Sequence, residues 1–172
     1  MSKSNTISPL SSKHKAPEHH RVKPEQHHRA FHVQPGHCYC PKCGAVGFHK
    51  HWYFAPEQEH ILRKDKNASQ VLCPGCTKIE QQLYEGEVIL ANSCFSTLSG
   101  EIIALIKHTE GVCWHKNPTA KLAGAVEEEE TIHVLTTTKF LAERIGKELQ
   151  KAFKGNLNVK RTEQFVRVYW TD

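Results

Sequence analysis

Two Cys-x-x-Cys turns constrain the fold of this chain more than any other feature of its sequence. They are Cys40-Pro41-Lys42-Cys43 and Cys73-Pro74-Gly75-Cys76, and 29 residues separate them. Two such turns can place four thiolates around one tetrahedral Zn²⁺. Gly44 follows the first pair, where a glycine permits the tight turn that directs backbone N–H groups at metal-bound sulfurs. We therefore predict one shared structural Zn²⁺ site, with the ligands Cys40, Cys43, Cys73 and Cys76.

A disulfide or a redox-active pair is the alternative reading of these cysteines. A redox site needs only one pair, placed at a strand-to-helix junction, so two matched pairs favour a shared metal. Cys38 lies just before the first pair, but Cys38-x-x-x-x-Cys43 would make a poorer metal-binding turn. We expect Cys38 to be a spare thiol, or a group that supports the ligands without binding the metal.

The N-terminal residues 1–37 differ in composition from the rest of the chain. They hold seven of the 13 histidines, and their six Lys and Arg against two Glu account for four of the five net positive charges. With almost no aliphatic residues, such a segment cannot offset the entropy lost on ordering. We predict a disordered His/Lys-rich tail that is solvated or contacts RNA, although its histidines can also bind a metal or an anion.

The cysteine content and the hydropathy pattern indicate the cellular compartment. Seven cysteines in 172 residues, four of them in Cys-x-x-Cys pairs, do not resemble the disulfide framework of a secreted protein. The sequence contains no run of 18 apolar residues and no apolar signal core near its start. We expect a cytoplasmic protein with no membrane partner.

Residues 38–86 are predicted to form the zinc-binding module. Residues 45–48 and 52–54 have the composition of strands, and the polar stretch 57–70 is expected to be a loop. Past Cys76, Ile79 and Leu83 recur at helical spacing, with Gly86 as the expected end of the helix. A turn, a hairpin and a helix that carries the last ligands is the order of a treble clef or zinc ribbon.

Residues 87–172 are predicted to form a ferredoxin-like α+β domain. Strand-like and helix-like patterns follow one another in the order β-α-β-β-α-β-β, which is the βαββαβ arrangement plus one strand. The clearest helix spans 140–153, where apolar residues recur at spacings of three and four. The carboxylate run Glu127–Glu130 is expected to be an exposed turn. We expect the two helices to cover one face of an antiparallel sheet and to leave the other partly open.

Motifs that would indicate an enzyme are missing from the sequence. A metal with four thiolate ligands has no open position for a water molecule, so it stabilises a fold without catalysing a reaction. Zinc deaminases place His-x-Glu before Pro-Cys-x-x-Cys, whereas here His108-Thr109-Glu110 follows both cysteine pairs. The sequence also lacks a Walker loop, GxSxG and GxGxxG. We predict that the protein is not an enzyme and expect no small-molecule substrate.

Two groups of cationic and aromatic residues are candidates for nucleic-acid binding. Aromatic rings can stack on bases while Lys and Arg neutralise phosphates, although the basic-Gly-aromatic signature of RRM domains is missing. Trp52 and Tyr53 can instead pack over the zinc module, and Phe165 and Tyr169 can cover an interface. The candidates are Lys50, Trp52, Tyr53, Arg63, Lys64 and Lys66 in the first group, and Phe165, Arg167 and Tyr169 in the second.

The motifs Cys40-Pro-Lys-Cys43-Gly44 and Leu72-Cys73-Pro-Gly-Cys76 resemble the zinc-binding region of the nonsense-mediated mRNA decay protein three family, the export adaptors of the large ribosomal subunit. This chain is much shorter, and those adaptors carry more zinc ligands and further domains. The segment 132–146 and the final Val168-Tyr169-Trp170 are similar to an uncharacterised family of small bacterial zinc-ribbon proteins with the same layout. The first resemblance implies a non-enzymatic role at the ribosome or on ribosomal RNA, and only the four cysteines carry over as ligands.

The sequence therefore favours a non-enzymatic zinc protein that binds RNA or associates with the ribosome. Two alternatives stay open. One is a protein–protein adaptor with a purely structural zinc, which would have a protein partner. The other is a thiol- or metal-sensing switch that uses Cys38 and the histidines.

Overall fold

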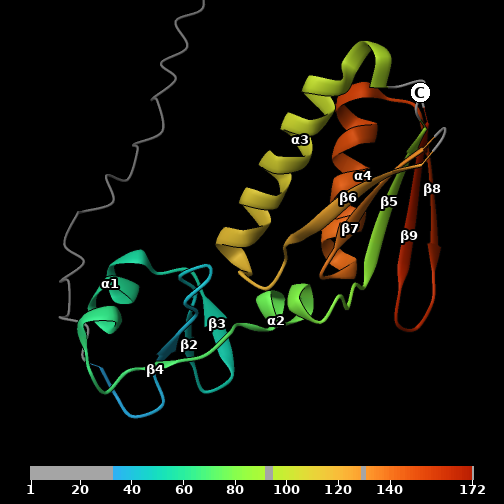
Figure 1. Ribbon diagram of the computed structural model, residues 1–172. Helices are drawn as coiled ribbons and strands as arrows, with labels where there is room; N and C mark the ends of the chain where they lie inside the picture. Colours follow the sequence, from blue (N-terminus) through green and yellow to red (C-terminus); the bar gives the residue numbers. More distant parts are fainter. Residues whose placement is uncertain (1–32, 92–94, 129–130, 172) are drawn as a thin grey trace, which may run out of the picture. The chain divides into compact units, whose positions relative to one another are not determined.

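The computed structural model describes residues 33–91, 95–128 and 131–171 (Figure 1). Most of the predicted tail therefore lies outside the described residues. The described residues form two β-sheets and four helices, and the predicted α+β class is confirmed. Among the described residues, no helix has the length and apolar character needed to cross a membrane.

The cysteine pairs belong to a small four-stranded sheet with two helices. The strand order is β3-β2-β1-β4, with β4 parallel to β1 and the other neighbouring pairs antiparallel. The predicted strands at 45–48 and 52–54 are confirmed as β2 and β3. The elements are β1 (Cys38–Tyr39), β2 (Val46–Phe48), β3 (His51–Tyr53), α1 (Pro56–Lys64), β4 (Ser69–Gln70) and α2 (Pro74–Glu80).

Helix α1 lies in the polar stretch that we expected to be a loop. Pro56 occupies its first turn, and the acidic Glu57 and basic Lys64 lie at the ends where they complement the helix dipole. Leu62 is its only fully buried side chain. The prediction was wrong because a helix that buries one residue lacks the apolar stripe by which helices are recognised.

Helix α2 begins at Pro74, which suits a first helical turn, but it ends before its predicted stop. Pro74 lies in its first turn, and its last residue is Glu80. Gly86, the expected end of the helix, instead begins β5 (Gly86–Ala91). A Cβ at Gly86 would lie 2.5 Å from Thr136 Oγ1, so close packing is what requires a glycine there.

The C-terminal elements follow the predicted order and form a five-stranded sheet with two helices. The strand order is β6-β7-β5-β9-β8. After β5, the elements are α3 (Phe95–Lys116), β6 (Leu122–Glu128), β7 (Thr131–Thr136), α4 (Lys139–Phe153), β8 (Asn156–Arg161) and β9 (Val166–Thr171). The turn expected at Glu127–Glu130 is wrong for its first two residues, because β6 continues to Glu128, which pairs with Thr131. Residues 129–130 lie outside the described residues.

Strand β9 makes the sheet mixed, contrary to the expected antiparallel arrangement. It lies between β5 and β8, parallel to β5 and antiparallel to β8. Val166, Val168 and Trp170 of β9 are buried, whereas Asn158 and Lys160 of β8 are exposed. The more apolar strand thus occupies the interior position, and the polar strand forms the edge, where charged side chains discourage pairing with other chains.

Helices α3 and α4 run side by side and pack against one face of this sheet (Figure 1). Thr138 caps α4, since its Oγ1 accepts a hydrogen bond from the Leu141 N–H at 3.3 Å. Leu141, Ile145 and Leu149 of α4 are buried in the same core as the apolar residues of β5 and β9. The other face of the sheet has no described helix over it.

Candidate metal centre

The sulfur atoms of Cys40, Cys43, Cys73 and Cys76 form one cluster, in which they all lie within 4.8 Å of one another. Cys40 and Cys73 are fully buried, Cys76 is almost fully buried, and Cys43 is half-buried. The fold therefore brings together the four cysteines that the spacing predicted. The cluster can hold a metal ion.

Backbone hydrogen bonds shape both cysteine turns. In the first turn, the Cys40 N–H donates to Ala45 O at 2.8 Å, and the Gly44 N–H donates to Cys40 O at 2.9 Å. Gly44 has φ +73°, a conformation that glycine adopts without strain. In the second turn, Cys73 is the N-cap of α2, and its Sγ accepts a hydrogen bond from the Cys76 N–H at 3.4 Å. Backbone carbonyls thus close the first turn, and the Cys73 sulfur closes the second.

The spacing of the sulfur atoms fits a tetrahedral site. With metal–sulfur bonds of about 2.3 Å, two ligand sulfurs in a tetrahedron lie about 3.8 Å apart. Cys43 Sγ and Cys73 Sγ are 3.6 Å apart, far beyond the S–S bond of about 2.05 Å in a disulfide. The described cysteines are all free thiols. A set of four sulfur donors suits zinc and other metals that prefer soft ligands.

Apolar side chains and a nearby cation surround the cluster. Ala45, Trp52 and Leu72 pack against the cysteines. The hydrogen bond with Cys73 lowers the pKa of Cys43 to about 4, and the Lys121 ammonium acts in the same direction. The same hydrogen bond, together with burial, raises the pKa of Cys73, and burial raises the pKa of Cys76 to about 11. A divalent cation would offset the cost of ionising these buried thiols.

Cys38 lies outside the cluster of ligand sulfurs. Its thiol donates a hydrogen bond to Gly47 O at 3.5 Å, and burial raises its pKa. A Cβ at Gly47 would lie 2.6 Å from Cys38 Sγ, so this thiol fills the space that the glycine leaves in β2. Cys38 is therefore a packed thiol beside the site.

The first group of nucleic-acid candidates is only partly available for binding. Lys50 is exposed at the tip of the β2–β3 hairpin. Trp52 packs against the cysteine cluster, and the Tyr53 hydroxyl donates to Gln58 Oε1 at 3.0 Å. Arg63 pairs with Glu59 and lies 5.0 Å above the Tyr39 ring, whereas Lys64 and Lys66 are exposed. The fold gives the two aromatic rings a packing role here.

The second group lies together on the open side of the five-stranded sheet. The Arg167 guanidinium lies 5.5 Å from the Phe165 ring centre, and its Nε donates to Glu87 Oε2 at 2.9 Å. The Lys160 ammonium lies 5.0 Å from the Tyr169 ring centre. Each aromatic ring is half-buried and has a cation against it. The sequence analysis missed Lys160, which joins this group only because β8 pairs with β9.

Glu87 and His133 are two further polar residues on this face that sequence reasoning missed. His133 Nδ1 lies 2.7 Å from Glu87 Oε1, and its Nε2 lies 2.9 Å from Thr131 Oγ1. Burial pushes the pKa of Glu87 upward, but the hydrogen bonds from His133 and Arg167 outweigh it and lower that pKa. This network depends on the register of three strands, which no local motif reveals.

Comparisons with known proteins place the chain in no family. No protein-family model matches it, and neither a curated protein nor a solved structure matches it. The resemblance to the ribosomal export adaptors therefore remains an expectation based on the two cysteine motifs. A functional proposal therefore rests on the geometry of the cysteine cluster and of the open face of the five-stranded sheet.

Proposed function

We propose that this chain is a cytoplasmic, non-enzymatic zinc protein that binds single-stranded RNA, free or within the ribosome. The cluster of four buried cysteines is the observation that carries the zinc assignment. Zn²⁺ commonly binds four thiolates in closed tetrahedral sites, which stabilise folds and have no open position for a substrate. The free cysteines suit the reducing conditions of the cytoplasm.

The small sheet is proposed to be a treble-clef or zinc-ribbon module. The first two ligands lie on the turn between β1 and β2, and the last two lie at the start of α2. Zn²⁺ would thus connect a hairpin to a short helix at their closest approach. In a module this small, the binding free energy of the metal would supply much of the folding free energy.

The C-terminal part is proposed to be a ferredoxin-like domain with β9 inserted beside its first strand. Its open sheet face is the proposed RNA surface. Arg167 and Lys160 flank the rings of Phe165 and Tyr169, which is the combination that single-stranded RNA requires. The hydrogen bond from Arg167 Nε to Glu87 Oε2 keeps the guanidinium group beside the Phe165 ring.

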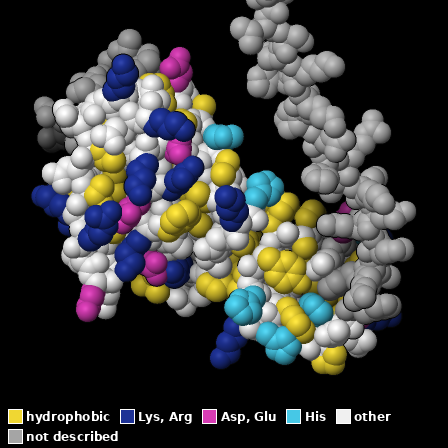
Figure 2. Space-filling view, turned by 180° about the vertical axis from the view of Figure 1, so that it is seen from behind, with side chains coloured by type: hydrophobic (Ala, Val, Ile, Leu, Met, Phe, Trp, Pro, Cys, Tyr) yellow, Lys and Arg dark blue, Asp and Glu magenta, His cyan; other side chains and the backbone are white. Residues whose placement is uncertain are grey.

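The charge of the molecule supports an anionic partner. The chain has a formal net charge of +5 at pH 7, of which residues 1–37 carry +4. Figure 2 shows Lys and Arg side chains scattered over one face of the molecule, with fewer Asp and Glu side chains among them. An excess of positive charge attracts RNA and raises the rate of encounter.

Binding of a fluorescein-labelled oligouridine, measured by anisotropy over a range of salt concentrations, tests this proposal. We expect Tyr169→Ala to weaken binding about tenfold, since stacking contributes about 1–3 kcal/mol per base. Tyr169→Phe keeps the ring and is the matched control, with near-wild-type affinity expected. Circular dichroism and zinc content would verify that both variants fold.

Binding that is insensitive to salt, or equal for the two variants, would count against an RNA surface on this sheet. An adaptor with a structural zinc would be favoured if the protein has no affinity for RNA and purifies without nucleic acid. The ratio of absorbance at the nucleic-acid maximum to that at the protein maximum would then be typical of a protein. Loss of zinc under mild oxidant would instead favour a thiol switch. These readings are distinguishable because each rests on a separate measurement.

A further inference from the structure

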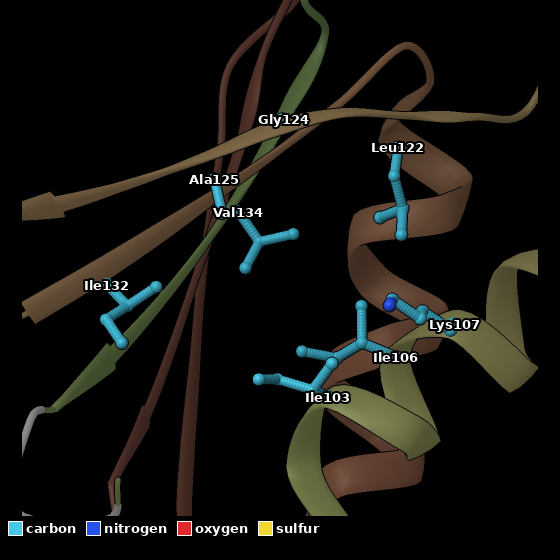
Figure 3. A pocket seen from close by; sticks show the side chains of 8 residues that line it. All are labelled: Ile103, Ile106, Lys107, Leu122, Gly124, Ala125, Ile132 and Val134. Carbon is cyan, nitrogen blue, oxygen red and sulfur yellow. The ribbon is translucent and has the colours of Figure 1, made fainter. Parts of the chain in front are cut away.

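An apolar cavity of about 390 Å³ lies between α3 and the strands β6 and β7 (Figure 3). It lies apart from the cysteine cluster and on the opposite side of the sheet from Arg167 and His133. Its aliphatic lining comes from Ile103 and Ile106 of α3, Leu122 and Ala125 of β6, and Ile132 and Val134 of β7. Binding pockets for small molecules have volumes of about 300–1,000 Å³ and mostly apolar walls, so this cavity has the size and character of one.

The local structure of β6 explains why the cavity is open. The pairing of β6 with β7 shifts between Leu122 and Gly124, where the strand has a bulge. The residues at and after the bulge are Ala123, Gly124 and Ala125, which have almost no side chain. A Cβ at Gly124 would meet nothing within 4 Å. The edge strand therefore leaves space beside α3 that larger side chains would have filled.

One cation stands at the rim of this cavity. Lys107 lines it, and Figure 3 shows the amine of Lys107 directed toward the space between Ile106 and Leu122. Lys107 is exposed and, among the described residues, has no hydrogen-bond or ion-pair partner. A lysine side chain can pack its methylene groups on an apolar surface while its ammonium group remains available to pair with an anion.

A second hollow of about 270 Å³ continues along α3 from Lys107 and adds a second cation. It is lined by Lys107, Glu110, Trp114 and Lys121. The Glu110 carboxylate already accepts a hydrogen bond from the Leu122 N–H at 2.7 Å. The Lys121 ammonium lies 5.5 Å from the Trp114 ring centre. The space along α3 is thus aliphatic at one end and positively charged at the other.

We propose that this cavity binds a monocarboxylic acid with an aliphatic tail. The tail would occupy the space between Ile103, Ile106 and Val134, and the carboxylate would pair with Lys107. The walls offer a polar ligand almost no hydrogen-bond partners, which excludes sugars and nucleotides from the apolar end. The ammonium group at the rim selects an anionic head over a neutral one.

Titration calorimetry on the zinc-loaded full chain, with decanoate and decan-1-ol as probes, tests the proposal. Both share the tail, but only decanoate carries a charge at neutral pH. We expect saturable 1:1 binding of decanoate, with decan-1-ol binding about fivefold more weakly because it forms no ion pair.

Three variants separate the tail site from the head site. Ala125→Leu would fill the cavity, and we expect it to abolish measurable binding of both probes. Lys107→Gln should weaken decanoate about fivefold and leave decan-1-ol unchanged. Lys116→Gln, at the exposed end of the same helix, is the matched control and should change neither affinity.

Thermal denaturation and zinc content would show that each variant folds. Absence of saturable binding by the wild-type chain would overturn the proposal, as would equal binding by Ala125→Leu. A wild-type dimer that Ala125→Leu dissociates would also overturn it, because a second copy would then cover this cavity. None of these three results bears on oligouridine binding, so failure of this proposal is distinguishable from failure of the RNA surface.

Discussion

Cys73 performs two tasks at the residue scale. Its sulfur belongs to the cysteine cluster that can hold a metal, and the same atom caps α2 by accepting a hydrogen bond from the Cys76 N–H. A thiolate at a helix N-terminus also interacts favourably with the helix dipole. The positions of the second ligand pair and of the helix start are therefore determined together.

Replacing Cys73 by serine separates these two tasks. Serine is a good N-cap residue but a poor zinc ligand, so Cys73→Ser should keep the helix start and lose the metal. We expect zinc content to fall from one equivalent per chain to near zero, measured by atomic absorption on the purified protein. Cys38→Ser is the control and should retain full zinc content. Retention of zinc by Cys73→Ser would show that this residue is not a ligand.

The pKa of Glu87, which its partners His133 and Arg167 lower, predicts a pH dependence. A carboxyl group whose pKa is lower in the folded state stabilises the fold above its unfolded pKa of about 4.3. That contribution is lost as the pH falls through the folded pKa. Glu87→Gln should therefore be about 1 kcal/mol less stable than wild type at pH 7, with the difference vanishing at acidic pH.

Urea denaturation of both proteins at several pH values measures this difference. Loss of zinc at acidic pH affects both proteins alike, so the difference between them isolates Glu87. A difference that grows as the pH falls would contradict the assignment. The same carboxylate positions Arg167, so the variant should also weaken RNA binding if Arg167 contacts RNA.

At the element scale, the β2–β3 hairpin holds two residues in a left-handed conformation. His49 has φ 46° and Lys50 has φ 68°, the values that a two-residue type I′ turn requires. Asn-Gly is the favoured pair for this turn, because neither residue is strained there. The chain instead carries two cationic or ionisable side chains at an exposed tip, at a cost in conformational energy.

The double change His49→Asn with Lys50→Gly should remove this strain. We expect it to stabilise the zinc-loaded protein by about 1 kcal/mol, seen as a higher midpoint of thermal unfolding. Lys66→Gly, at an exposed position where φ is not positive, is the control and should not stabilise. An unchanged or lower midpoint for the double variant would mean that His49 and Lys50 make compensating contacts.

Two glycines in the helices predict opposite effects of the same substitution. A Cβ at Gly146 of α4 would lie 2.4 Å from Val168 Cγ1, whereas a Cβ at Gly111 of α3 would meet nothing within 4 Å. Gly146→Ala should destabilise by about 1–3 kcal/mol, because α4 must move away from β9. Gly111→Ala should stabilise by up to about 1 kcal/mol, because alanine favours the helix.

Urea denaturation of the two alanine variants checks this pair. A stabilising Gly146→Ala would contradict the close contact between α4 and β9. Because both changes add one methyl group within a helix, the difference between them measures packing alone.

At the scale of the whole molecule, the cysteine cluster and the large core are separate. The cluster packs with Ala45, Trp52 and Leu72, while Val88, Ile145 and Trp170 belong to the core of the five-stranded sheet. Contacts also link α2 to the C-terminal part, since a Cβ at Gly75 would meet Thr119 O at 2.5 Å and Lys78 Nζ donates to Thr137 O at 3.1 Å. A metal ion held by the cysteine cluster would thus stabilise one part directly and the other only through α2.

Removal of the metal should therefore unfold one part and spare the other. After treatment with a chelator, we expect residues 38–80 to lose protection from amide hydrogen exchange, while α4 and β9 keep theirs. Hydrogen exchange with mass spectrometry resolves the two regions, and re-addition of Zn²⁺ should restore protection. Equal loss of protection in α4 would show that the chain unfolds as one cooperative unit.

Sequence reasoning succeeded where a pattern is local. The Cys-x-x-Cys spacing identified the cluster of four cysteines, and the apolar repeat from Phe140 to Phe153 identified α4. It failed for α1, which buries only Leu62, and for the place of β9 beside β5. The sequence can rank β9 as more apolar than β8, but which strand it pairs with depends on the packing of the whole sheet.

The sequence by itself determined the four candidate ligands and the order of the C-terminal elements, because ligand spacing and apolar periodicity are properties of neighbouring residues. Only the tertiary structure decided that Trp52 packs on the cysteines, that Glu87, His133 and Arg167 meet on one sheet face, and that α3 leaves a cavity beside β6. These arrangements join residues far apart in the chain. Strand register and close packing create them, and neither is encoded in any short stretch of residues.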